Sequence, residues 1–179
     1  MTAIWTRAGT PTSSMPMSEY RLAWEALEGR SGHEVGRLLL AGLYRLETGE
    51  EMPEISTGEF GKPYFADSAY HFSISHTPRH AFCVLSKHPI GIDAEEKDRD
   101  VRLRLADKIL SEPERQRYDA APDRRDALLR LWVLKEASVK LTGRGLRGYP
   151  NHTDFVPADP RITEIDGCYV AVLEEDYAF

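Results

Sequence analysis

Apolar and polar residues alternate in the middle of the chain, which is the pattern of a β-strand with one buried face. Phe72 and Ile74 alternate with serines, so residues 70–76 are predicted to form a strand. Short turns then lead to two further apolar segments, residues 81–86 and 90–94. Because these connections are short, we expect the three strands to form an antiparallel meander.

Two other segments carry apolar residues at helical spacing. The first is predicted to end at Thr48-Gly49, and its apolar positions are Val35, Leu38, Leu39, Leu43 and Leu46. The second covers residues 126–142, with Gly143 as its expected end. Between them, Ser111, Pro113 and Glu114 have the spacing of a helix start, with a capping serine and a glutamate three positions later.

The end of the chain is predicted to form a β-hairpin. Residues 162–165 and 168–173 are rich in β-formers, and Asp166-Gly167 between them favours a two-residue turn. Residues 8–18 contain many turn-forming residues and are expected to be irregular.

Composition narrows the class of protein. The chain has 179 residues and a net charge of -6, which argues against a general nucleic-acid binder. No apolar segment is long enough to span a membrane, and the N-terminus lacks the pattern of an export signal. Cys83 and Cys168 lie in apolar strands without metal-type spacing, so we expect reduced core residues in a cytoplasmic protein.

The most informative polar residues form two acidic clusters. Asp93 and Glu95 are two positions apart in a predicted strand and therefore share one face. Glu136 and Lys140 are four positions apart in a predicted helix and share one side of it. Three carboxylates are suitable ligands for Mg²⁺ bound together with a substrate's phosphates, and the lysine adds positive charge. Read singly, the first pair fits a solvated acidic turn and the second a surface ion pair.

These clusters resemble the paired motifs of the 4'-phosphopantetheinyl transferases, particularly the longer surfactin-type class. The matching segments are Gly91-Ile92-Asp93-Ala94-Glu95 and Trp132-Val133-Leu134-Lys135-Glu136-Ala137-Ser138-Val139-Lys140. Further matches follow the family order: Phe60-Gly61-Lys62-Pro63, His71-Phe72-Ser73-Ile74-Ser75-His76, Pro89-Ile90 and Thr142-Gly143-Arg144-Gly145-Leu146. Order and spacing together make the resemblance specific.

The resemblance implies an α+β fold made as a pseudo-dimer. Two similar lobes, residues 1–98 and 99–179, would each pack a long helix on a small antiparallel sheet. The active site would lie at the lobe interface. Because both halves would then be present in one chain, a monomer is expected.

The resemblance also implies an activity. The enzyme would transfer the 4'-phosphopantetheine arm of coenzyme A to a serine of an apo acyl or peptidyl carrier protein and release 3',5'-ADP. Asp93, Glu95 and Glu136 would hold Mg²⁺, with Asp93, Glu136 and Lys140 as the catalytic residues. Glu136 would be the base, and Lys140 would stabilise the leaving phosphate. Coenzyme A would be held by Arg45, Lys62, Ser75, His76 and Lys140.

Other functions remain open at this stage. One alternative is a catalytically degenerate module that binds coenzyme A or a carrier protein, and another is a magnesium-dependent phosphohydrolase. The Ser75-His76 pair does not indicate a serine hydrolase, because neighbouring residues of a strand point to opposite faces. An acidic carrier would need a local basic surface, and the candidates are Arg99, Arg102, Arg104, Lys108, Arg115 and Arg117.

Overall fold

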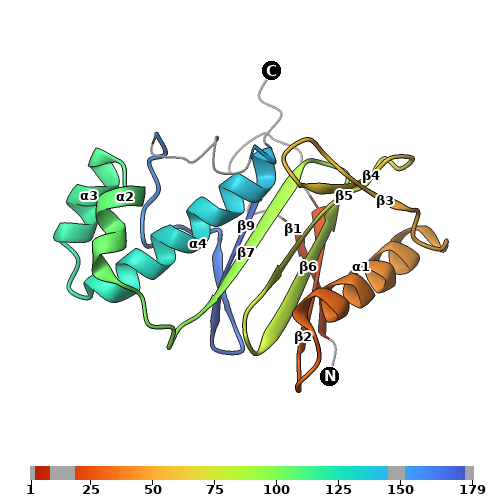
Figure 1. Ribbon diagram of the computed structural model, residues 1–179, viewed down its shortest axis with the longest axis horizontal. Helices are drawn as coiled ribbons and strands as arrows, with labels where there is room; N and C mark the ends of the chain where they lie inside the picture. The colour runs from red at the N-terminus through yellow and green to blue at the C-terminus, as the bar shows by residue number, and fades with distance from the viewer. Residues whose placement is uncertain (1–2, 9–18, 145–151, 176–179) are drawn as a thin grey trace.

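A computed structural model describes residues 3–8, 19–144 and 152–175 of the protein (Figure 1). Its strands are β1 (Ala3–Ala8), β2 (Glu19–Ala26), β3 (Ile55–Thr57), β4 (Pro63–Phe65), β5 (His71–His76), β6 (His80–Ser86), β7 (Ile90–Glu96), β8 (Ile162–Ile165) and β9 (Cys168–Glu174). Its helices are α1 (Gly32–Thr48), α2 (Ala106–Ile109), α3 (Glu112–Asp119) and α4 (Arg124–Thr142), and a 3-10 turn, Leu103–Leu105, precedes α2. The predicted mixture of helices and strands is confirmed.

The strands form two main sheets and one small one. The first sheet has the order β1-β2-β6-β5, the second has the order β7-β9-β8, and β3 pairs only with β4. All these pairs are antiparallel. The α+β class predicted from the sequence therefore holds, with antiparallel sheets and separate helices.

Helix α1 covers the outer face of the first sheet (Figure 1). Ser31 caps its start by accepting a hydrogen bond from the backbone N–H of Glu34, and Gly49 ends it in the left-handed conformation. Its buried face includes Leu40 and Leu43, which belong to the same core cluster as residues of β2, β5 and β6. The predicted helix and its glycine stop are confirmed.

Helix α4 packs on the second sheet, against β7 and β9. Asp123 caps its start and Gly143 ends it, so the helix begins two residues before the predicted range and stops where expected. The approach to β7 is very close at Gly91. A Cβ atom added there would lie 2.2 Å from the Ala137 carbonyl oxygen and 2.4 Å from the Leu141 nitrogen. Only glycine therefore permits this helix–strand distance.

The inner faces of the two sheets pack on each other. Alternate residues of β6 and β7, such as Phe82, Val84 and Ile92, share one buried cluster with Val170 of β9. The other faces of these strands contact the helices instead. Each sheet is thus buried on both sides, with its own long helix outside and the other sheet inside (Figure 1).

One predicted connection is wrong. Strands β5 and β6 form the expected antiparallel pair, but β7 does not continue their meander. It pairs along its whole length with β9, from Ile90 opposite Glu174 to Glu96 opposite Cys168. The apolar pattern predicts the strand but carries no information about which of several similar edges it meets.

Strands β1 and β2 were not predicted. In β2, Tyr20, Leu22 and Trp24 occupy alternate positions and contribute to the core between the sheets, so the period of two was present in the sequence. Part of the segment expected to be irregular, residues 9–18, lies outside the described residues. Ala8, the first residue of the segment expected to be irregular, is instead the last residue of β1.

The predicted turn and cap motifs are confirmed. Ser111 and Glu114 form a reciprocal capping box at the start of α3. Asp166 and Gly167 both have positive φ, 43° and 76°, which is the two-residue turn expected for the β8–β9 hairpin. Among the described helices, none is both long and apolar enough to cross a membrane.

The Gly91 contact gives a direct test of the helix–strand packing. We expect Gly91→Ala to lower the free energy of unfolding by about 2 to 3 kcal/mol, because a backbone clash forces α4 away from β7. The measurement is urea unfolding followed by circular dichroism. Gly42→Ala is the matched control, since nothing lies within 4 Å of a Cβ there. An unchanged stability for Gly91→Ala would contradict the packing.

Candidate active site

The acidic residues of β7 and α4 meet where the helix crosses the strand. Asp93 and Glu95 follow Gly91 on the face of β7 that is turned toward α4, as the strand period predicts. Glu136 and Lys140 lie one turn apart on the helix. The close contact at Gly91 therefore brings the two acidic clusters into the same part of the fold.

Asp93 is the most buried member of this group, with 6% of its surface exposed. Its Oδ1 accepts hydrogen bonds from Lys140 Nζ at 2.7 Å and from the Ser75 hydroxyl at 3.1 Å. Its Oδ2 is buried without a hydrogen-bond partner among the described residues. Burial raises the pKa of Asp93, and the nearby Glu95 carboxylate raises it further, against the effect of Lys140.

Glu95 is held by two donors on a single oxygen. The indole Nε1 of Trp132 donates to Glu95 Oε1 at 2.8 Å, and the Arg99 guanidinium donates to the same atom. The second carboxylate oxygen is not used by either donor. Trp132 was predicted to be a core anchor, and it does pack against the core of α4. Its hydrogen bond to Glu95 could not be read from the sequence.

Glu136 is half-buried close to both carboxylates. Burial raises the pKa of Glu136, the charges of Asp93 and Glu95 raise it too, and Lys140 and Arg99 act in the opposite direction. The site therefore concentrates negative charge in a poorly solvated space. Such a set of carboxylates is stable only with positive charge nearby.

The chemical type of these donors suits a hard divalent cation, although their side chains do not converge on one position. Carboxylate oxygens are the preferred protein ligands of Mg²⁺, and Asp93 Oδ2 is a buried acceptor to which none of the described residues donates. In this structure the positive charge next to Asp93 comes from Lys140, and the positive charge next to Glu95 comes from Arg99. No three His, Cys, Asp or Glu side chains in the described part of the chain converge closely enough to hold a metal ion.

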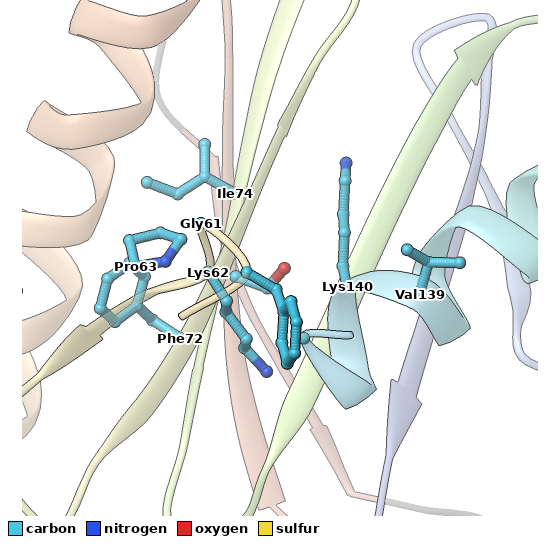
Figure 2. A pocket seen from close by; sticks show the side chains of 10 residues that line it. Gly61, Lys62, Pro63, Phe72, Ile74, Val139 and Lys140 are labelled. Carbon is cyan, nitrogen blue, oxygen red and sulfur yellow. The ribbon is translucent and has the colours of Figure 1, made fainter. Parts of the chain in front are cut away.

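A cavity of about 260 Å³ lies beside this acidic group, between the β3–β4 loop, β5 and the end of α4. Figure 2 shows Lys62 from the loop and Lys140 from the helix among its lining residues. Lys62 Nζ donates to the Leu141 carbonyl at 2.7 Å, at the C-terminal end of α4. Burial lowers the pKa of Lys62. Two of the residues predicted to hold coenzyme A therefore line one cavity.

The other three predicted coenzyme A contacts lie elsewhere. Ser75 is buried and bonded to Asp93, so its hydroxyl points toward the acidic group. His76 is exposed, and its ring lies against Gly32 at the start of α1. Arg45 is exposed on α1, forms an ion pair with Glu51 at 3.3 Å and does not line the cavity. Ser75 still contacts one of the two lysines, because Lys140 Nζ donates to its hydroxyl at 3.0 Å, whereas His76 and Arg45 do not line the cavity.

The lysine next to Glu136 has a different environment. Lys135 is fully buried and pairs with Glu114 of α3 at 2.7 Å, and it also donates to Thr153. The backbone N–H of Phe155 and the Thr153 hydroxyl donate to the same Glu114 carboxylate. This buried pair joins α4 to α3 and to the segment that leads to the last hairpin.

A Cys-His-Asp arrangement elsewhere in the protein does not form a second catalytic site. His80 Nε2 lies 2.9 Å from Asp166 Oδ2, and its Nδ1 lies 3.5 Å from Cys168 Sγ. Cys168 is fully buried, and burial raises the pKa of its thiol to about 12. The thiolate needed for nucleophilic attack is therefore disfavoured. Cys83 is likewise free and buried, as predicted.

Comparison with known proteins agrees with this geometry. A family model described as the 4'-phosphopantetheinyl transferase superfamily matches residues 89–177, a range that includes β7, α4 and β9. The chain belongs to this superfamily. The match contains Asp93, Glu95 and Glu136 together, the residues that meet at the α4–β7 crossing.

Individual 4'-phosphopantetheinyl transferases are also similar to the chain. The Sfp transferase of Bacillus subtilis (strain 168) is 33% identical over 118 residues, covering 64% of this chain and 51% of that protein. Another Bacillus subtilis 4'-phosphopantetheinyl transferase is 35% identical over 117 residues, with 63% and 52% covered. The gsp transferase of Aneurinibacillus migulanus is 33% identical over 90 residues, with 49% and 37% covered.

These similarities confirm the resemblance to the surfactin-type class of 4'-phosphopantetheinyl transferases. The chain spans about half the length of the two Bacillus subtilis transferases that it matches. Family membership is therefore established for this chain, while the activity of the whole protein is a separate question.

The hydrogen bond from Trp132 to Glu95 gives a prediction about cation binding. We expect Trp132→Phe to weaken Mn²⁺ binding about tenfold, because a carboxylate ligand loses the donor that orients it. Electron paramagnetic resonance of free Mn²⁺ measures the binding. Trp24→Phe is the control, since the Trp24 indole nitrogen has no hydrogen-bond partner among the described residues. Equal Mn²⁺ affinity in the two variants would refute the role of Trp132.

Proposed function

We propose that this protein transfers the 4'-phosphopantetheine arm of coenzyme A to a serine of an apo carrier protein, with release of 3',5'-ADP. The observation that carries the proposal is the meeting of Asp93, Glu95 and Glu136 with Lys140 beside a cavity. Family membership and the similar named transferases support it.

We propose Mg²⁺ as the cofactor and Asp93, Glu95 and Glu136 as its ligands. The support is the buried Oδ2 of Asp93, which has no hydrogen-bond partner among the described residues, together with the burial and the nearby carboxylate charges that raise the pKa of Glu136. When bound, the ion neutralises pyrophosphate charge and aligns the attacking and leaving oxygens. If the ion took the place of Lys140 and Arg99 beside Asp93 and Glu95, these two cations would be free to bind other anions.

Glu136 and Lys140 have the properties that the transfer requires. The carrier serine is a weak nucleophile, so a base must accept its proton. Glu136 is the proposed base because its carboxylate lies near Asp93 and Glu95 at the acidic site, where burial raises its pKa. Lys140 lines the cavity and can stabilise the departing phosphate with its positive charge. Lys62 contributes a second positive charge to the same cavity.

A basic hollow just after β7 supports an acidic carrier as the partner. The hollow has a volume of about 270 Å³ and is lined by four basic residues, Arg99, Arg102, Arg104 and Lys108, together with Asp100, Val101 and Leu105. Arg102, Arg104 and Lys108 have no acidic partner among the described residues, in contrast to Arg115 and Arg117. Because Arg99 also contacts Glu95, the hollow lies next to the acidic site.

The two-lobed organisation stays part of the proposal. Each main sheet has its own long helix, which supports two similar lobes with the site between them. The division into residues 1–98 and 99–179, the monomeric state and the cytoplasmic location remain predictions from the sequence. Strand β7 belongs to the first range but pairs with β9 of the second.

A degenerate binding module is the second candidate, and one observation favours it. Lys140 bonds Asp93 and Arg99 bonds Glu95, so two of the three carboxylates already have positively charged partners. A protein that never binds the metal ion could retain this arrangement. It would bind coenzyme A or a carrier without transfer.

Intact-mass spectrometry of apo carrier proteins distinguishes these functions. With coenzyme A and Mg²⁺ we expect a gain of one phosphopantetheine group, and a chelator should abolish it. Glu136→Gln should reduce the rate at least about 100-fold because the base is lost. Coenzyme A binding without transfer to any carrier would instead favour the degenerate module. Release of phosphate or 3',5'-ADP without an acceptor would indicate a phosphohydrolase.

The basic hollow gives a prediction about the carrier. We expect Arg104→Glu to raise the KM for an acidic carrier about tenfold with little change in the KM for coenzyme A, because charge complementarity acts on the encounter. Lys87→Glu is the control, since Lys87 lies in the turn before β7, away from the hollow. Steady-state transfer rates at two salt concentrations measure both effects. Equal carrier KM values for the two variants would show that the hollow is not part of the docking surface.

A further inference from the structure

The segment that leads from β7 to the 3-10 turn, residues 97–102, forms one side of the basic hollow. Four of the seven residues that line the hollow belong to it. The segment contains a turn but no helix or strand. Its conformation is therefore not fixed by a ladder of backbone hydrogen bonds, and it depends on contacts from other elements.

Arg125, in the first turn of α4, makes such a contact. A single nitrogen of its guanidinium, Nη2, donates to the carbonyl oxygen of Lys97 at 2.8 Å and to that of Arg99 at 2.5 Å. Hydrogen bonds from a charged donor are stronger than those between neutral groups. The half-buried Arg125 side chain thus forms a bridge from α4 to two carbonyls of the turn.

The bridge completes a set of bonds around the turn. The backbone N–H of Lys97 donates to the Gly167 carbonyl at 2.9 Å, and that of Arg99 donates to the Glu96 carbonyl at 2.9 Å. The N–H groups of the turn therefore bond to the second sheet and to the end of β7, while Arg125 holds its carbonyl groups from the other element. Without Arg125 the turn would be held by its N–H groups alone.

The turn determines where Arg99 lies. The Arg99 side chain lines the hollow, and its guanidinium also donates to the Glu95 carboxylate. Its backbone carbonyl is the group that Arg125 holds. A surface segment that is already ordered binds a partner more tightly than a mobile one, because less conformational entropy is lost on association.

We propose that Arg125 is a positioning residue for the carrier-docking surface. Arg125 lines neither the cavity beside Lys140 nor the basic hollow, so it acts through the carbonyl groups of Lys97 and Arg99. It keeps the basic side chains of the segment in the arrangement that faces an acidic carrier. This role rests on the proposed transfer to an acidic carrier protein.

Hydrogen exchange tests the bridge in the free protein. In Arg125→Met we expect the Arg99 amide to exchange at least about tenfold faster by NMR, because the turn opens more often without the bridge. Arg124→Met is the matched control, since it removes the same charge from the same helical turn. The Arg124 guanidinium bonds the Asp119 carbonyl at 3.2 Å instead of the turn. Unchanged protection of Arg99 in a folded Arg125→Met protein would overturn the bridge.

Carrier binding tests the consequence for docking. The probe is a fluorescently labelled apo acyl carrier protein, and its anisotropy is measured without coenzyme A or a divalent cation. We expect Arg125→Met to raise the Kd about fivefold and Arg124→Met to raise it less than about twofold. Arg125→Lys retains a charged donor and should recover most of the affinity. In transfer assays, Arg125→Met should raise the KM for the carrier but leave kcat and the KM for coenzyme A unchanged.

The outcomes distinguish this role from the proposed function. Faster exchange of the Arg99 amide with an unchanged carrier Kd would overturn the positioning role. An equal rise in Kd for Arg124→Met and Arg125→Met would assign the effect to net charge and would also overturn it. In both cases, transfer to the carrier by the wild-type protein would leave the proposed function intact. Failure of the wild-type protein to bind or modify any apo carrier would instead refute the proposed function together with this role.

Discussion

The close approach of α4 to β7 is the constraint on which the rest of the site depends. At Gly91 the helix backbone occupies the space in which any side chain would lie. Because the approach is backbone to backbone, it cannot be relieved by a change of rotamer. The same approach brings Glu136 and Lys140 of the helix over Asp93 and Glu95 of the strand. Tight packing and concentrated charge are therefore two results of one contact.

The charge arrangement depends on protein cations that lie next to two of the three carboxylates. Burial opposes the ionisation of Asp93, and the charge of Glu95 adds repulsion. In this structure Lys140 bonds Asp93 and Arg99 bonds Glu95.

Lys135 and Glu136 are consecutive in α4 but make contacts on different sides of the helix. Glu136 is half-buried at the acidic site, whereas Lys135 forms a fully buried pair with Glu114. A buried ion pair contributes little net stability, but removal of one partner leaves an unpaired charge. The pair therefore favours one rotation of α4 over the alternatives. This rotation is the one that directs Glu136 and Lys140 toward β7.

The sequence by itself determined the two long helices, the strands β5 to β9 and the identity of the acidic residues, but not β1 and β2. The period of two in β5 and β7, the period of α1 and α4, and the glycine stops at Gly49 and Gly143 depend on local backbone geometry, which neighbouring residues specify. The family motifs in turn identified Asp93, Glu95 and Glu136.

Only the tertiary structure decided how these elements are joined. It placed β7 beside β9 and not in a meander, because a strand edge can pair with any compatible edge and the choice depends on global packing. It also turned Ser75 toward Asp93, while His76 and Arg45 lie away from the cavity. Hydrogen bonds between residues distant in sequence, such as that between Trp132 and Glu95, produce no repeating pattern in the sequence from which they could be predicted. Their contacts exist only once the helix lies on the strand.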